Sequence, residues 1–403
     1  MSPIEEMAIA SRCLKTARLA AGFAWAAAVL CAPAHGQETY HYYFGNTHAH
    51  TVCSDGKETA TEHYRKAKAA GFDFYAVTDH ALAKHANFTP QSYADTRRAA
   101  DECTDATFVA IAGFEFSEND GPGGKGHLNA LNTAGYLDAT GPEVNLPVFY
   151  DWLVKNRTPA TAASFNHPGS RTHNGYDYLN PERRDEITMF EVINSGKLLY
   201  AGFLVALNKG WRVAPIAGND DHGTWRLTHH RYRTGVLATS LTRDSIMQAM
   251  RSRRVYCTWD TNLKLSLKVN DQMMGSVLRN PSSLTFSIDV SDPDIGDANE
   301  RITKIEIIGD DGVLVGSKDF SEHSVSWNVT YAPQYGYYFV KVYTADKADG
   351  PGAYLKEVQA RASSRGKKRG PAAGAKASST TLPATSPDTT EGATAYSAPV
   401  WID

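Results

Sequence analysis

Short apolar runs alternate with segments of helical composition through the first two thirds of the chain. The run Tyr42-Tyr43-Phe44 and the run over residues 72–78 have the length and composition of buried strands. The segment between them, residues 59–70, is predicted to be a helix, capped by Thr59 or Thr61 and ended by Gly71. The same pattern predicts strands over residues 107–115, 127–132, 161–166, 188–193 and 213–217, and helices over residues 90–103, 148–155 and 198–209. Strand–helix–strand units with polar residues at the strand ends favour a parallel α/β barrel with its site at the C-terminal face.

The pattern changes near residue 261, where apolar and polar positions begin to alternate. Period-two segments occur at residues 263–269, 284–290, 302–308, 325–329 and 337–343, which predicts an antiparallel β-sandwich. We therefore assign a barrel to residues 40–260 and a small β-sandwich domain to residues 261–350. Residues 362–395 are rich in Ala, Ser, Thr, Gly, Pro and Lys, and are predicted to be disordered. Residues 396–403 are apolar enough to return as a last strand or a docking tail.

The N-terminus has the composition of a secretory signal peptide. Arg12, Lys15 and Arg18 precede an apolar stretch over residues 19–31, which is too short to span a bilayer. Ala32-Pro33-Ala34 then fits the small-x-small cleavage rule. The alternative is an amphipathic N-terminal helix of a cytosolic protein. We predict removal of residues 1–34, a periplasmic or secreted location, and no membrane span.

Composition narrows the class of partner. The chain has 403 residues, of which 42% are hydrophobic and 21% charged, as in soluble globular proteins. A formal net charge of -3 provides no general basic field, so nucleic acid is not an expected partner and a small-molecule substrate is. Cys53, Cys103 and Cys257 remain after the signal, so at most one disulfide can form. The oligomeric state is not indicated.

Candidate metal ligands stand at the ends of the predicted strands. His48, His50 and Asp55 follow the first apolar run, and alternate residues of an extended segment point the same way, so both imidazoles can bind one ion. Later runs are followed, or in one case preceded, by further residues of the same kind: His80, Glu115, His127, His167, Asp220 and His222. Imidazole and carboxylate groups repeated at strand ends indicate a metal site.

These residues lie in motifs that resemble the PHP (polymerase and histidinol phosphatase) metallohydrolase superfamily. The motifs occur in the family's order between residues 42 and 223: His48-Ala-His50 with Ser54-Asp55-Gly56, Thr78-Asp79-His80, Glu115, His127, Asn166-His167-Pro168 and Asp220-Asp221-His222. The β domain and the Ser397–Ile402 ending look like the CehA/McbA branch, which includes carbamate-cleaving hydrolases. The resemblance implies a distorted (β/α)7 barrel with up to three metals at the C-terminal strand face.

The resemblance also implies how the ligands divide among the ions. The first ion would be held by His48, His50, Glu115 and Asp220; the second by Glu115, His127 and His167; the third by Asp55, His80 and His222. Glu115 would bridge the first two ions. We therefore expect two or three divalent ions, Mn, Fe or Zn. Asp55 stands where some relatives carry His, which favours Mn²⁺ or Fe²⁺ over Zn²⁺ there.

The predicted activity is hydrolysis by a hydroxide that bridges two metal ions. A phosphoesterase acting on small phosphomonoesters or phosphodiesters is the leading interpretation, with Glu115, Asp220 and His222 as the residues closest to the chemistry. A carbamate, amide or ester hydrolase using the same ligands is the alternative, and a non-catalytic binding protein is a second one. Arg171 and His173 could bind a substrate anion or belong to an ordinary loop.

Overall fold

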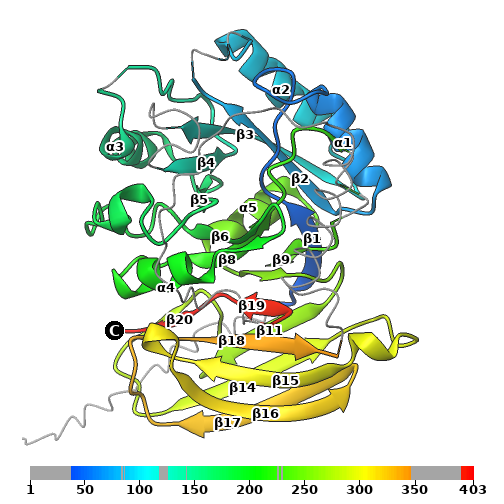
Figure 1. Cartoon of the computed structure of the whole chain (residues 1–403), viewed down its shortest axis with the longest axis vertical. Coiled ribbons are helices and arrows are strands. Elements are labelled where there is room, and N and C mark those ends of the chain that lie inside the picture. Colours follow the sequence, from blue (N-terminus) through cyan, green and yellow to red (C-terminus); the bar gives the residue numbers. More distant parts are fainter. Residues whose placement is uncertain are drawn as a thin grey trace, which may run out of the picture. The chain divides into compact units, whose positions relative to one another are not determined.

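The strands predicted in the first part of the chain form one strongly curved sheet (Figure 1). β1 (His41–Asn46) pairs in parallel with β2 (Phe74–His80), and β2 pairs in parallel with β3 (Val109–Ser117). The sheet continues through β4 (His127–Leu131), β5 (Ala162–Asn166), β6 (Met189–Asn194), the short β7 (Lys197–Leu198) and β8 (Ala214–Gly218). The fold is therefore mixed α/β with a curled half-barrel sheet, and the (β/α)7 count remains a prediction.

The computed structural model describes residues 38–82, 85, 87–117, 126–141, 143–224, 227, 230–345 and 392–403. The predicted signal peptide, residues 1–34, lies outside the described residues, as does almost all of the predicted disordered segment. The last residues of that segment, 392–395, are described, and residues 393–395 are buried. Among the described residues, no helix has the length and apolar character needed to cross a membrane.

The helices begin where the sequence supplies a cap. Thr59 caps α1 with a reciprocal hydrogen-bond pair to Glu62, and Thr89 caps α2 in the same way with Ser92. Their bounds are α1 (Ala60–Ala69), α2 (Pro90–Cys103), α3 (Leu146–Asn156), α4 (Tyr200–Asn208) and α5 (Arg243–Arg251). α1 packs on β2 and α2 on β3, while α5 contacts β9 (Arg233–Ala238), β3 and β5. The helices thus support the strands whose ends carry the candidate ligands.

β4 runs antiparallel to both of its neighbours, which corrects the expectation of a parallel barrel. The short connection from Ser117 to His127 cannot hold a crossover helix, and a parallel pair would need a connection of a dozen or more residues. The chain therefore turns back. Because β4 is reversed, its first residue, His127, pairs with Ser117 at the end of β3 and with Asn166 at the end of β5. A residue at the start of a strand thereby reaches the same edge of the sheet as residues at strand ends.

Two strands that the apolar pattern did not predict complete the curved sheet. β9 pairs antiparallel with β1 along five residue pairs, and β10 (Val255–Thr258) pairs antiparallel with β9. Beyond the strand ends, Ala49 and Asp221 form an isolated parallel bridge. β1 and β8 are thus joined where the candidate ligands lie.

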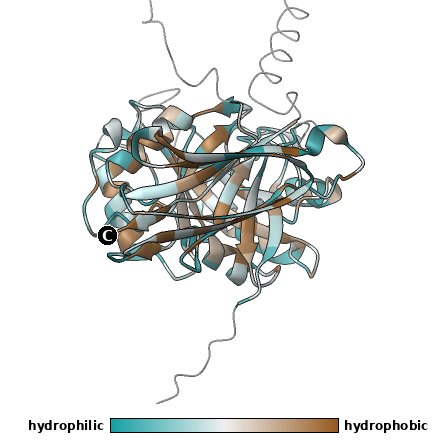
Figure 2. Ribbon diagram, turned by 90° about the horizontal axis from the view of Figure 1, so that it is seen from below, coloured by the Kyte–Doolittle hydropathy of each residue, from teal (hydrophilic) through white to brown (hydrophobic). Residues whose placement is uncertain are grey.

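The C-terminal part contains the predicted antiparallel strands in two layers, with brown and teal positions alternating along them (Figure 2). One layer is a four-stranded sheet in the order β12 (Gln272–Met273), β11 (Lys264–Val269), β14 (Leu284–Ser291) and β17 (Ser324–Tyr331). The other contains β15 (Ile302–Ile308), β16 (Leu314–Glu322) and β18 (Tyr337–Thr344), with the short β13 (Val277–Leu278) at its edge. One hydrophobic core includes residues of α5 and of both layers, such as Ile246, Ile288 and Val340.

The second layer is continuous with the curved sheet through the C-terminal tail. β19 (Ala395–Ser397) pairs with β10 on one side and with β18 on the other. β20 (Val400–Ile402) pairs with β18 and β13. The period-two pattern identified these strands, but it did not show which strand would be the neighbour of which. The division of the chain at residue 260 remains a prediction.

Tyr396 provides a test of the tail's contribution to stability. Its side chain is fully buried and packs against Tyr200 with ring centroids 5.5 Å apart. We expect Tyr396→Ala to lower the free energy of unfolding by about 3–5 kcal/mol, the cost of deleting a large buried aromatic side chain. Chemical denaturation measures it. Phe320→Ala, which truncates a partly exposed residue of β16, is the control and should cost far less. Equal losses would show that the tail contributes little.

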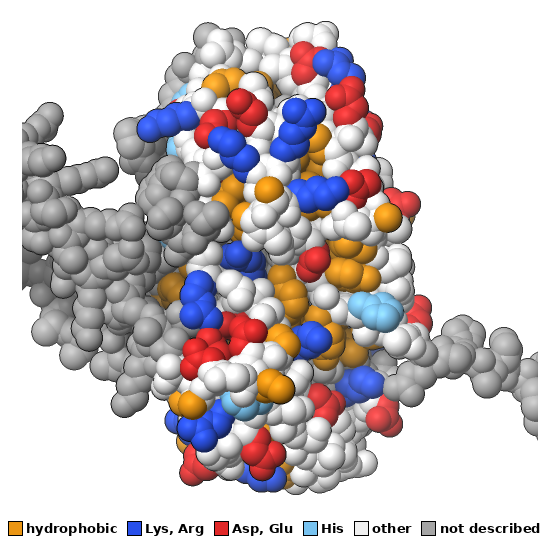
Figure 3. Space-filling view, turned by 90° about the vertical axis from the view of Figure 1, so that its right-hand side faces the viewer, with side chains coloured by type: hydrophobic (Ala, Val, Ile, Leu, Met, Phe, Trp, Pro, Cys, Tyr) orange, Lys and Arg blue, Asp and Glu red, His pale blue; other side chains and the backbone are white. Residues whose placement is uncertain are grey.

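Charged side chains of both signs are mixed on the face shown in Figure 3. Neither Lys and Arg nor Asp and Glu form an unbroken field over the part of this face that the structure describes. This mixture agrees with the small net charge of the chain.

Candidate metal centre

His48 and His50 lie on an extended segment that continues β1 beyond its last paired residue. The backbone N–H of His50 donates to the carbonyl of Asp221 at 2.7 Å, and the N–H of Asp220 donates to the carbonyl of His48 at 3.1 Å. These two bonds hold the segments after β1 and β8 side by side. The two imidazoles and Asp220 are therefore brought together by backbone pairing, as the alternation argument predicts.

The facing nitrogens of the two imidazoles are close enough to share one ion. Nε2 of His48 lies 3.1 Å from Nε2 of His50, and Oδ1 of Asp220 lies 3.1 Å from the latter. Both imidazoles are buried. Nδ1 of His48 lies 2.8 Å from Glu191 Oε1, so a proton on Nδ1 would be donated to this carboxylate and Nε2 would be the nitrogen that binds a metal.

Glu115 is the centre of the cluster. Its buried carboxylate stands at the end of β3 and receives a hydrogen bond from Nδ2 of Asn166 at 2.9 Å. Five imidazoles have a ring nitrogen near its oxygens: His80 at 2.8 Å, His127 at 3.2 Å, His48 and His167 at 3.3 Å, and His50 at 3.6 Å. A carboxylate surrounded in this way can bridge two cations.

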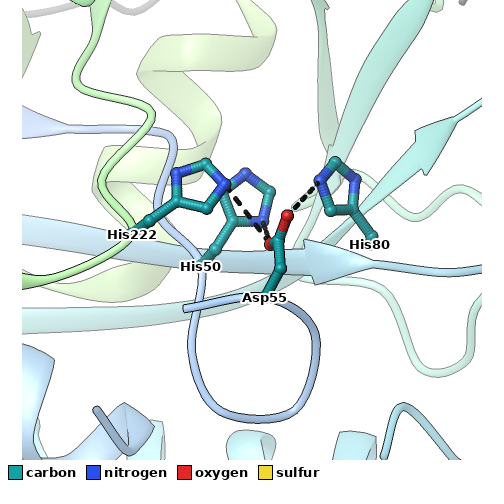
Figure 4. A group of neighbouring side chains, drawn as sticks. All are labelled: His50, Asp55, His80 and His222. Carbon is teal, nitrogen blue, oxygen red and sulfur yellow. Dashed lines mark ion pairs between the residues drawn. The ribbon is translucent and has the colours of Figure 1, made fainter. Parts of the chain in front are cut away.

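Asp55 joins the remaining imidazoles at the outer edge of the cluster, as Figure 4 shows. Its Oδ1 lies 3.3 Å from Nε2 of His222 and 3.9 Å from Nδ1 of His50, and its Oδ2 lies 3.6 Å from Nε2 of His80. The side chains of Asp55 and His222 are each 40% exposed, whereas that of Glu115 is fully buried. Among the described residues of the cluster, Asp55 and His222 are thus on the side that is open to solvent.

The cluster keeps its carboxylates charged. Burial opposes ionisation of Glu115, but His127, His48 and His80 outweigh it and hold the pKa of Glu115 well below its ordinary value. The pKa of Asp220 is lowered too, because His48 and His50 outweigh burial. Burial, reinforced by His80, lowers the pKa of His50 to about 3, so its imidazole is neutral near pH 7. Ionised carboxylates and a neutral imidazole are the forms that bind metals.

The residues fit divalent ions in three adjoining groups. In each group, ligand atoms lie within 4.8 Å of one another: His48, His50 and Asp220; His80, Glu115 and His127; and His50, Asp55, His80 and His222. Nδ1 of His50 is buried and makes no hydrogen bond to the described residues. The groups differ from the predicted division, since His80 joins both Glu115 and Asp55. All nine predicted ligands nevertheless meet in one cluster.

Glu191 on β6 belongs to the site although the sequence analysis did not select it. It accepts from His48 Nδ1 at 2.8 Å, from the backbone N–H of His167 at 2.5 Å and from Asn194 Nδ2 at 2.8 Å. Gly218 makes room for it, because a Cβ there would lie 1.9 Å from Glu191 Oε1. The sequence did contain a signal for this residue, which is a glutamate inside an otherwise apolar strand. A buried charged residue requires a partner, so such a glutamate is a candidate for a site.

Asp79 stabilises the loop that carries Asp55. It accepts hydrogen bonds from the backbone and hydroxyl of Thr51 at 2.6 and 2.7 Å and from the hydroxyl of Ser54 at 2.6 Å. His85, which matched no motif, stacks on His80 with ring centroids 5.0 Å apart. Both residues orient ligands from outside the cluster.

The two predicted anion-binding residues occupy different environments. His173 is buried, and its Nδ1 and Nε2 lie 2.9 Å from Thr172 Oγ1 and from the carbonyl oxygen of His127. Burial lowers the pKa of His173 to about 3, so its imidazole is neutral near pH 7. Its contact with the carbonyl oxygen of His127 helps to hold the backbone of that residue. Binding an anion would break one of these contacts. Arg171 is exposed, and its substrate-binding role remains a prediction.

No protein-family model and no curated protein matches the sequence. Solved structures that are similar to the chain include three with TM-scores below 0.5. A Bacteroides vulgatus two-domain protein containing a predicted PHP-like metal-dependent phosphoesterase is 18% identical, with 76% of this chain and 95% of that chain covered and a TM-score of 0.43. A candidate metal-dependent phosphoesterase from Bifidobacterium adolescentis is 15% identical, with 44% and 87% covered and a TM-score of 0.28. A Chromobacterium violaceum amidohydrolase with bound sulfate and no metal is 14% identical, with 45% and 88% covered and a TM-score of 0.27.

Proposed function

We propose that this protein is a metal-dependent hydrolase of the PHP type and that it cleaves small phosphomonoesters or phosphodiesters. The observation that carries the proposal is the buried carboxylate of Glu115 with ring nitrogens of five histidines within 3.6 Å. A set of imidazoles around one carboxylate is costly to bury unless it binds cations. Two or three divalent ions, Mn, Fe or Zn, would be held by this cluster.

The chemistry follows from the ions that the residues would hold. Bound divalent ions lower the pKa of water toward neutrality and offset the negative charge that develops on phosphoryl oxygens. Glu115 and Asp220 supply fixed negative charge on the buried side of the centre. His222 lies on the exposed side, with Nδ1 3.0 Å from the backbone carbonyl of Asp220 and Nε2 toward Asp55. With Nδ1–H donating to that carbonyl, the lone pair of Nε2 would be left for the cation at the exposed side of the cluster.

Three adjoining ligand groups support a phosphoester over a carbamate. A phosphoryl group presents several charged oxygens, and each group of ligands offers a cation position beside the next. A carbamate, amide or ester has a single carbonyl oxygen to polarise and needs fewer positions. The same ligands can serve both reactions, so the two activities are distinguished by assaying both kinds of substrate. A periplasmic or secreted location belongs to the proposal and rests on the N-terminal sequence.

The test compares substrates on the purified protein without residues 1–34, loaded with Mn²⁺. We expect p-nitrophenyl phosphate or bis-p-nitrophenyl phosphate to be hydrolysed and His48→Ala to abolish turnover, because a buried ligand of the centre is lost. His41→Ala, which removes an exposed histidine at the start of β1, is the control and should retain activity. If only the naphthyl carbamate were hydrolysed, the protein would be assigned to the carbamate and amide hydrolases. If the metal-bound protein turned over none of the three substrates, the result would contradict the enzyme proposal.

A further inference from the structure

A second cluster of carboxylates lies away from the candidate metal centre, at the junction of the curved sheet and the C-terminal layers. Asp260 follows β10, Asp292 follows β14, and Glu300 ends the short helix η3 (Ala298–Glu300) just before β15. One carboxylate oxygen from each lies within 4.8 Å of the others, and the three residues are at most 3% exposed. Three strand ends therefore bring three buried negative charges together.

Arg231 forms ion pairs with two of the three carboxylates. Nη2 of Arg231 lies 3.1 Å from Oδ2 of Asp260 and 2.6 Å from Oε1 of Glu300, and this side chain is 44% exposed. Oδ1 of Asp292 accepts from the backbone N–H of Asp294 at 2.8 Å, whereas Oδ2 makes no hydrogen bond to the described residues. A buried carboxylate oxygen beside two other carboxylates lacks a partner.

A buried carboxylate oxygen without a hydrogen-bond partner is stabilised by binding a proton or a cation. Burial raises the pKa of Asp292 to about 7, and repulsion from Asp260 and Glu300 acts in the same direction. A negative charge on Asp292 is costly, because the side chain is buried beside two other carboxylates. A divalent cation would remove that cost, because it would offset the excess negative charge that Arg231 leaves.

We propose that Asp260, Asp292 and Glu300 form a calcium site that joins the curved sheet to the C-terminal layers. All the ligand atoms are oxygens, which suit a hard cation and not the transition metals that imidazoles select. Ligands that share one Ca²⁺ at about 2.4 Å lie at most about 4.8 Å apart, and the three carboxylates meet this limit. The site would hold β10, β14 and β15 in register at one point. This proposal is independent of the hydrolase assignment.

The test measures calcium on the full-length mature protein with its imidazole centre first saturated with Mn²⁺. After equilibrium dialysis against Ca²⁺, elemental analysis should find one Ca²⁺ per chain in the wild type. Asp292→Asn keeps the shape and the bond from Asp294 but removes the charge, and we expect Ca²⁺ affinity to fall about tenfold or more, because ligand charge sets calcium affinity. Asp289→Asn, on the exposed face of β14, is the matched control and should bind Ca²⁺ normally.

Thermal unfolding gives a second readout. Added Ca²⁺ should raise the melting temperature of the wild type and of the Asp289→Asn variant, and not that of the Asp292→Asn variant. Manganese content should be equal in all three proteins, which separates this site from the imidazole centre. The proposal is overturned if the wild type binds no Ca²⁺, or if wild type and Asp292→Asn bind it equally. In the first case, protonation of Asp292 is sufficient to neutralise its charge. In the second case, Ca²⁺ binds at a site that does not include Asp292.

Discussion

Glu115→Gln is expected to lower kcat/KM on the phosphate substrate by between about a hundredfold and about four-thousandfold, because removing one partner of a buried charged pair costs about 3–5 kcal/mol and each 1.4 kcal/mol is a factor of ten. Glutamine keeps the size of the side chain and can still accept the hydrogen bond from Asn166. What it removes is the negative charge between five imidazoles. The measurement is kcat/KM at saturating Mn²⁺, together with the metal content of the dialysed protein.

A buried glutamate elsewhere provides the control for Glu115. Glu186 is also buried, and its Oε2 pairs with Arg157 at 2.7 Å and with Arg251 at 3.0 Å. Glu186→Gln should lower the melting temperature while leaving metal content and kcat/KM close to the wild type. If Glu115→Gln retained the wild-type metal content and activity, the bridging role of this carboxylate would be wrong, and with it the main support for the proposed function.

The sequence predicts most of the site because the ligands follow strands that are easy to recognise. The apolar runs before His48, His80 and Glu115 are buried strands, and their ends meet at one edge of the curved sheet. The local sequence pattern is sufficient here. When a polar residue follows a buried strand, the strand determines at which edge of the sheet that residue lies and which way its side chain points. The nine predicted ligands consequently lie in one cluster.

Features that depend on distant partners were harder to predict. The direction of β4 follows from a short connection and not from its own composition. β16 has a mostly exposed surface without apolar alternation, so its sequence resembles a loop, and only pairing with β15 makes it a strand. β19 follows a low-complexity segment, and its place between β10 and β18 is set by tertiary contacts. Periodicity reports the buried face of an element, but it does not identify the neighbour.

Glu191 was not predicted for a similar reason, because two of its three partners, His48 and His167, come from other segments of the chain. It is fully buried on β6 and bonds to the ring of His48, the backbone of His167 and the amide of Asn194. Without its acceptor, the imidazole of His48 would lose its preferred tautomer, and the ring would turn more freely. Glu191 is therefore a positioning residue for the metal centre, although it is not one of the predicted ligands.

We expect Glu191→Ala to weaken metal binding by about 10- to 100-fold, the usual cost of removing a residue that orients a metal ligand. Glu191→Gln retains an acceptor for His48 but loses the charge, so its loss should be smaller and excess Mn²⁺ should restore kcat. Metal affinity, measured by competition with a chelator, distinguishes this role from general support of the fold, which would lower the melting temperature alone.

Gly218→Ala tests the position of Glu191 without changing its chemistry. The added Cβ would lie 1.9 Å from Oε1, so the carboxylate must move away from His48. Metal affinity should then fall as it does in the Glu191→Ala variant, and combining the two changes should add little, because both remove the same contact. Full additivity would mean that Gly218 and Glu191 act separately. Unchanged metal affinity in all of these variants would show that the Nδ1 contact does not orient His48.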